Sequence, residues 1–163
     1  HEAEKDSTRQ RFKTMGGRIV YGGGGITPDY IVKSDRLNEY TVQLRSKLVF
    51  LETADKYLDQ HGADLRASYG KDPRRFVEES NVTPQMLEDL KEIAQAKSVT
   101  LNQELFDKDL RYIKAFTKAY VARGIWGNEG SAQVMLKEDA QFKKAMSLFP
   151  EAEKIAKAMT SRQ

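Results

Sequence analysis

The pattern of hydrophobic and polar positions changes along the chain, from short mixed runs at the start to a helical spacing after residue 36. Residues 11–15 and 18–21 are rich in aromatic, β-branched and polar side chains, and Gly16 and Gly17 stand between them. Because a glycine pair tolerates the positive φ angles of a tight turn, this segment predicts a β-hairpin.

A run of glycines, residues 22–25, follows the hairpin and predicts a sharp backbone corner. Pro28 disfavours helix at the residue before it, so the chain there should be extended. Residues 30–32, which are Tyr-Ile-Val, then predict a third short strand. So few strands bury little apolar surface, and we expect them to need helices or a larger sheet behind them.

From Leu37 onward, apolar residues recur every three to four positions, which predicts one helix ending near His61 and Gly62. Some of its leucines stand seven residues apart, a spacing that would also suit a coiled coil. The heptad pattern is short, so we expect the stripe to face the domain's own core. The residues of this apolar stripe are Leu37, Tyr40, Leu44, Leu48, Leu51, Ala54 and Leu58.

The next stretch, residues 62–81, is the least regular and predicts a connecting loop with Phe76 and Val77 as a short apolar anchor. A helix should then begin after Thr83, which suits the N-cap, with Pro84 in its first turn. Its buried face is expected at Leu87, Leu90, Ile93 and Ala94.

A longer helix is predicted over residues 103–123, ending at Gly124 as a C-terminal glycine cap. Its expected buried residues are Phe106, Leu110, Ile113, Phe116 and Tyr120. Trp126 and Gly127 lie in the break after it, a further helix starts near residue 129, and Pro150 separates off a last helix over residues 151–159.

The pattern as a whole predicts a mainly α (α+β) fold, in which a β-hairpin and strand segment precedes a helical bundle of about five helices. We expect the division to fall between residues 1–35 and residues 36–163.

Composition is typical of a globular protein, with 39% hydrophobic and 31% charged residues in a chain of 163. No apolar run approaches the roughly 20 residues that span a bilayer. The absence of cysteine excludes disulfides and thiolate chemistry. The net charge is +3, and basic residues outnumber acidic ones after residue 110, which we attribute to a solvated helix face.

The candidates for chemistry are few. The glycine run 22–25 does not lead into a helix with the lysine and hydroxyl of a phosphate-binding loop, so we expect no nucleotide cofactor. His1 and His61 are too isolated to predict a metal pair, and the basic pairs are too small to indicate nucleic acid. Trp126 could anchor a partner, although a lone Trp between helices is more often part of the core.

Two motifs resemble a known family. Phe12, Thr14, Gly17 and Arg18, followed by Gly24, Gly25, Ile26, Pro28 and Asp29, are similar to the end of the catalytic domain in the C-terminal-processing, or tail-specific, serine peptidases. Residues 112–115, 121–123, 125–130 and 145–153 resemble the helical C-terminal extension of the Bacteroidetes members. Together the matches span most of the chain, and the resemblance is weakest between residues 65 and 101.

The resemblance implies a parent endopeptidase with a serine nucleophile and a lysine base, and neither can lie in residues 1–11. We therefore expect a C-terminal fragment of such an enzyme, with a protein or peptide substrate and a location in the cell envelope or periplasm implied for the parent. Gly17, Arg18, Gly24, Gly25, Pro28 and Asp29 would be frame residues, with no catalytic, cofactor or metal residue in the chain. The alternative is a free-standing helical interaction or assembly module, and whether it forms a homo-oligomer stays open.

Overall fold

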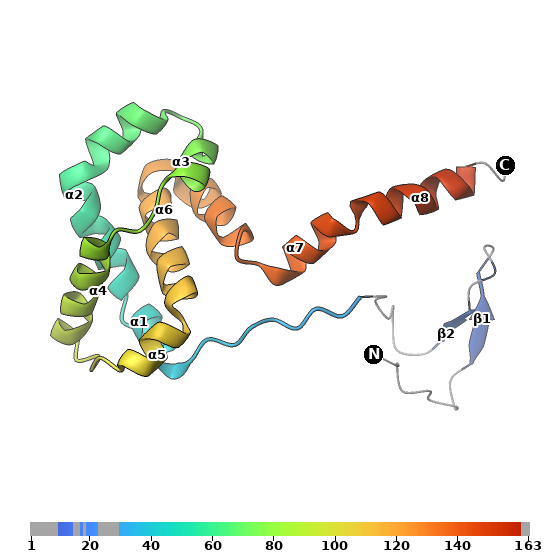
Figure 1. The fold of residues 1–163 in the computed structure, drawn as a ribbon, viewed down its shortest axis with the longest axis horizontal. Helices are drawn as coiled ribbons and strands as arrows, with labels where there is room; N and C mark the ends of the chain where they lie inside the picture. The colour runs from blue at the N-terminus through green and yellow to red at the C-terminus, as the bar shows by residue number, and fades with distance from the viewer. Residues whose placement is uncertain (1–9, 15–16, 18, 23–29, 161–163) are drawn as a thin grey trace. The chain divides into compact units, whose positions relative to one another are not determined.

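The computed structural model describes residues 10–14, 17, 19–22 and 30–160, with the side chains of 158–160 left aside. It is mainly α-helical with a small N-terminal hairpin, as the sequence predicts. The chain divides into two compact units, one of residues 34–144 and one of residues 1–33 with 145–163, and each is described by itself (Figure 1). The assignment of residues 1–35 to a peptidase domain stays a prediction.

The hairpin pairs β1 (Arg11–Lys13) with β2 (Ile19–Tyr21) in antiparallel register, Phe12 opposite Val20. Gly17 has φ +83°, as a turn glycine requires, and its N–H donates to the carbonyl of Thr14 at 2.9 Å. The predicted third strand at residues 30–32 is wrong, because the sheet in the described part of the chain has two strands only. Every described side chain of the two strands is exposed.

The helix predicted from Leu37 to Gly62 is instead two helices, α1 (Glu39–Ser46) and α2 (Val49–Tyr69). The chain breaks at Leu48, which has φ +58°, and α2 continues through Gly62 until Gly70, whose φ is +64°. A glycine therefore ends this helix only where the backbone takes a left-handed conformation. Because the helix breaks here, the apolar positions do not all lie on one buried face as predicted: Leu44 is fully buried, but Leu48 and Leu51 are exposed.

The loop predicted over residues 62–81 is wrong as well, because α2 fills its first part and α3 (Pro73–Glu79) its second. Asp72 caps α3 by accepting from the N–H of Arg74 at 2.9 Å. The predicted apolar anchor of Phe76 and Val77 is confirmed, since both side chains are buried.

The next helix, α4 (Pro84–Ala96), begins where the sequence predicts. The hydroxyl of Thr83 accepts from the N–H of Met86 at 3.2 Å, and Pro84 occupies the first turn. Leu90 and Ala94 are buried, while Leu87 and Ile93 are partly buried against the same core.

The helix predicted over residues 103–123 is divided into α5 (Gln103–Lys108) and α6 (Leu110–Leu136). Asp109 stands at the division, buried, and its carboxylate accepts from the N–H of Asn38 at 2.9 Å. The predicted end at Gly124 is also wrong, because the helix runs on to a kink at Gly127 and resumes after it. The last helices are α7 (Ala140–Ser147) and α8 (Phe149–Thr160), close to the predicted restart at Pro150.

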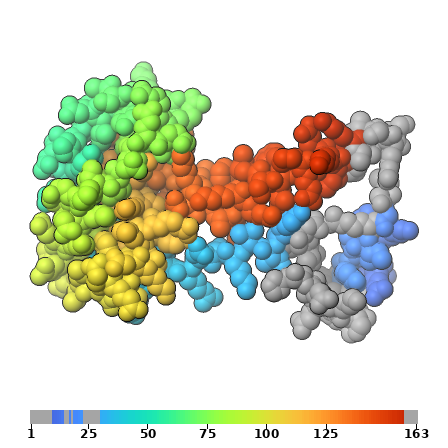
Figure 2. Space-filling view, viewed as in Figure 1, coloured from blue at the N-terminus to red at the C-terminus, as the bar shows by residue number. Residues whose placement is uncertain are grey.

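The unit of residues 34–144 is built on α2 and α6, which pack against each other, with α3 against α6 and α4 against α2 (Figure 1). Side chains of α2, α3 and α4 cover much of this unit in the view of Figure 2. One core cluster comprises Tyr40, Leu44, Val49, Phe50, Leu90, Ala94, Val99, Phe106 and Ile113. A second comprises Ala54, Phe76, Val77, Met86, Ala119, Val121, Ala122 and Val134.

Candidate binding cleft

A cleft of about 420 Å³ opens in the helical unit between the C-terminal end of α3 and helix α6. Its volume lies within the range of ordinary ligand sites. Apolar side chains and four cations line it together with a single carboxylate. The lining residues are Val77, Ser80, Asn81, Val82, Arg111, Lys114, Ala115, Lys118, Val134, Lys137 and Glu138.

Lys118 lies partly buried in the cleft wall. Its Nζ donates to the carbonyl oxygens of Val77 at 2.8 Å and Ser80 at 2.6 Å, two acceptors at the end of α3. Burial lowers the pKa of this ammonium group, and repulsion from Lys137 lowers it further. The two bonds hold the end of α3 against α6 and fix a positive charge inside the cleft.

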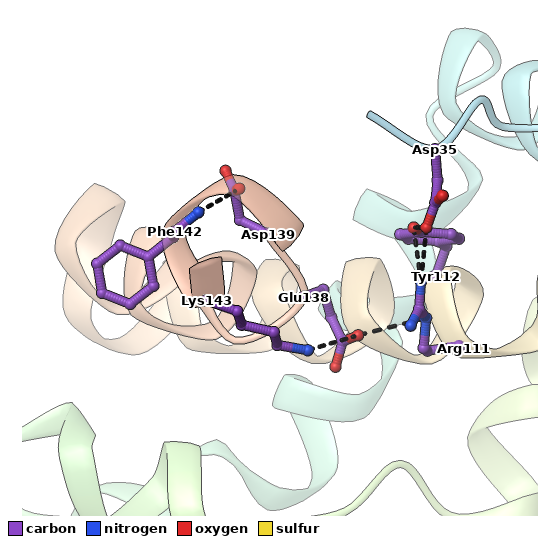
Figure 3. Close-up of polar contacts among 7 residues, drawn as sticks. All are labelled: Asp35, Arg111, Tyr112, Glu138, Asp139, Phe142 and Lys143. Carbon is purple, nitrogen blue, oxygen red and sulfur yellow. Dashed lines mark hydrogen bonds and ion pairs between the residues drawn. The ribbon is translucent and has the colours of Figure 1, made fainter. Parts of the chain in front are cut away.

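A polar network forms the adjoining wall (Figure 3). The carboxylate of Asp35 accepts hydrogen bonds from the hydroxyl of Tyr112 and from Nη2 of Arg111, the latter at 2.9 Å. Nε of Arg111 lies 3.4 Å from Oε2 of Glu138, and Nζ of Lys143 lies 3.8 Å from the same oxygen. The network thus joins the segment before α1, helix α6 and the start of α7.

The oxygen of Glu138 that faces these two cations is buried and has no hydrogen-bond partner among the described residues. Among the residues that the structure describes, Arg111 and Lys143 are the cations that form ion pairs with this oxygen. Beside it, the Asp139 carboxylate accepts from the N–H of Phe142 at 2.9 Å, which caps the first turn of α7 (Figure 3). The turn between α6 and α7 therefore places one acidic group in the cleft and uses the other for capping.

The hydrogen bond from Tyr112, followed by the charge of Arg111, holds the pKa of Asp35 below its ordinary value although desolvation opposes them. A lowered folded-state pKa stabilises the fold above the ordinary pKa, and this contribution disappears as the pH falls through the folded-state value. We expect the protein to lose more stability between about pH 5 and pH 2 than Asp35→Asn does, because the variant cannot titrate there. Urea unfolding at several pH values in this range measures the free energy of unfolding of both proteins. If this free energy falls equally with pH in the two proteins, the prediction is wrong.

The residues singled out in the sequence lie apart from the cleft. Gly17 is in the hairpin turn, whereas Arg18, Gly24, Gly25, Pro28 and Asp29 lie outside the described residues. Trp126 donates from Nε1 to the carbonyl of Gly70 at 2.9 Å and packs on Phe76 with ring centroids 5.0 Å apart. Its contacts are therefore intramolecular, and its role in docking a partner stays a prediction.

His61 is exposed on α2 with its ring 4.6 Å from that of Tyr57, and it does not end the helix as predicted. Within the ranges that the structure describes, no three His, Asp or Glu side chains are grouped to hold a metal ion. Over the same ranges, no helix combines the length and apolar character needed to cross a membrane.

The cleft was missed in the sequence although part of its signal was visible. Arg111, Lys114 and Lys118 are spaced by three and four positions, which places them on one side of a helix. Taken alone, the excess of basic residues after residue 110 indicates a solvated helix face. The facing wall has no signal in the sequence, because the pattern of the segment that contains α3 predicts a loop.

The fold defines a compact helical module with a basic cleft. Its residues 40–127 match a family described as a family of unknown function (DUF8443), and the chain belongs to that family. The matched segment contains α3, α4 and the first part of α6, while Lys137 and Glu138 lie beyond it. No curated protein matches the chain, and no solved structure matches it.

Proposed function

We propose that this chain is a docking module that is not itself catalytic, and that its helical unit holds a segment of a protein substrate or partner. The observation that carries this proposal is the cleft, in which the apolar side chains of Val77, Ala115 and Val134 stand beside charged groups. Such a mixture suits a peptide segment, because aliphatic side chains can be buried while polar groups fix the orientation.

The state of Lys118 supports a binding role over a catalytic one. A lysine with a lowered pKa can act as a general base when its neutral nitrogen accepts a proton from a nearby hydroxyl. Here Nζ donates hydrogen bonds to two carbonyl oxygens at the end of α3, so this lysine fastens α3 to α6, which is a structural task.

The larger protein that we propose for this module is a serine endopeptidase of the C-terminal-processing type, on the strength of the two ordered motifs around residues 12–29 and 112–153. Isolation of the protein that contains this chain from its source tests this proposal directly. A longer protein whose peptide cleavage is stopped by a serine-directed inhibitor is expected. A protein of this length without such cleavage would favour the alternative of a free-standing interaction module.

The docking proposal predicts where a protein segment binds. We expect reduced and carboxymethylated α-lactalbumin, which is unfolded, to perturb amide signals of the ¹⁵N-labelled chain at residues 77–82, 111–118 and 134–138. Native α-lactalbumin is the matched control and should leave them unchanged, because a folded chain offers no free segment. Perturbation confined to other helices, or none at all, would contradict a docking role for the cleft.

A further inference from the structure

The cleft is more positive than a general peptide site requires. Arg111, Lys114, Lys118 and Lys137 line it, against the single carboxylate of Glu138. In such a cleft the fields of like charges add, and the low-dielectric wall weakens the field less than water would. The ligand that best complements this surface carries negative charge.

The four cations differ in how far they are already paired. Arg111 contacts Asp35 and Glu138, and Lys137 lies 2.5 Å from a carboxylate oxygen of Glu78. Lys114 is exposed on α6, and its side chain makes no ion pair or hydrogen bond with any other described residue. Together with Lys118, whose hydrogen-bond partners are neutral carbonyls, it leaves positive charge in the cleft that forms no ion pair within 4.0 Å among the described residues.

The lining also favours a peptide over a nucleic acid. Single-stranded nucleic acids bind basic grooves that contain aromatic rings on which bases stack. The cleft has no aromatic side chain among its lining residues and has aliphatic ones instead. Carboxylates spaced between aliphatic residues would therefore meet the cations and the apolar floor at the same time.

We propose that the cleft selects an acidic peptide segment, in which carboxylates alternate with aliphatic side chains, and that Lys114 receives one of those carboxylates. This inference rests on the proposed docking function and adds the charge of the ligand to it. The ion pairs of Arg111 with Asp35 and of Lys137 with Glu78 are exposed, and such pairs are weak, so carboxylates of the ligand can replace Asp35 and Glu78 at modest cost.

Two capped peptides test the proposal on the full chain: one of three Glu-Val pairs, and one of three Gln-Val pairs with the same length and apolar content. The acidic peptide should perturb the cleft amides and bind about tenfold more tightly than the neutral one, a ratio that several weak ion pairs can supply. Raising the salt concentration should weaken the acidic peptide only.

Lys114→Glu should weaken binding of the acidic peptide about tenfold, because an attraction becomes a repulsion. Arg123→Glu is the matched control, since Arg123 is an exposed cation on α6 outside the cleft, and it should change the affinity less than about twofold. Both variants should keep the unfolding midpoint of the parent chain, because neither residue makes an ion pair with the described residues.

The outcomes separate this inference from the docking function. Equal affinity for the two peptides, or no effect of Lys114→Glu on the affinity, would overturn selection of the ligand by charge. The proposed docking function would still stand in that case if unfolded α-lactalbumin perturbs the cleft amides. A single-stranded oligothymidylate that binds as tightly as the acidic peptide would overturn it in favour of general polyanion binding. Failure of both peptides and of unfolded α-lactalbumin to move the cleft amides would overturn both proposals.

Discussion

Phe50→Ala is expected to lower the free energy of unfolding by about 3–5 kcal/mol, the largest effect that we predict for one substitution. Phe50 is fully buried at the start of α2. Its ring centroid lies 5.3 Å from that of Phe116 and 6.4 Å from that of Tyr120, both on α6. Truncation removes this aromatic packing between the two central helices and leaves a cavity that the surrounding side chains fill only in part.

Urea unfolding followed by circular dichroism measures the change, with Val42→Ala as the control. Val42 is half exposed on α1, so its truncation should change the free energy of unfolding by less than about 0.5 kcal/mol. A loss below about 1 kcal/mol for Phe50→Ala would mean that α2 and α6 do not share a tightly packed core.

The parts of the fold that could be predicted from the sequence are those fixed by local chemistry. Thr83 and Pro84 start α4 as expected, because a hydroxyl at the N-cap and a proline in the first turn act within a few residues. Gly17 similarly marks the hairpin turn. These signals do not depend on the remainder of the chain.

The helix boundaries that were missed depend on contacts between distant segments. The break at Asp109 coincides with its bond to the N–H of Asn38, which is far away in sequence. The break at Leu48 requires a left-handed conformation at a leucine, which no local propensity favours. Gly62 lies inside α2 and Gly70 ends it, although the two residues are chemically identical.

The cleft likewise combines features that local sequence shows with features that depend on contacts between distant segments. The spacing of Arg111, Lys114 and Lys118 on one side of a helix is visible in the sequence. The hydrogen bonds from Nζ of Lys118 to the carbonyl oxygens of Val77 and Ser80 depend on a tertiary contact between α6 and the end of α3, which no local pattern shows. Lys137 lines the cleft because the chain turns back at the kink of Gly127, where the sequence predicts only a break between two helices.

Gly127→Ala is expected to lower the free energy of unfolding by about 1–3 kcal/mol, because Gly127 has φ +68° and ψ −154°, a region that is nearly closed to side chains. An added Cβ would meet no atom within 4 Å, so the effect would come from backbone strain. The matched control is Gly62→Ala, in the interior of α2 with an ordinary helical backbone. Its Cβ would lie 3.3 Å from the flexible end of Arg66, and we expect no loss, or a gain of up to about 1 kcal/mol.

The kink at Gly127 also sets the geometry of the cleft, so the same substitution is expected to weaken peptide binding. After the kink Gly130 lies so close to the first half of α6 that an added Cβ would stand 3.0 Å from the carbonyl oxygen of Ala122. This return lets Val134 line the cleft together with Ala115. Relaxation of the strain in Gly127→Ala would move Val134 away, which should weaken binding of the acidic peptide and broaden the amide signals of residues 130–138. Gly62→Ala should leave both unchanged, and equal effects of the two variants on stability and binding would show that the left-handed kink does not hold the cleft in place.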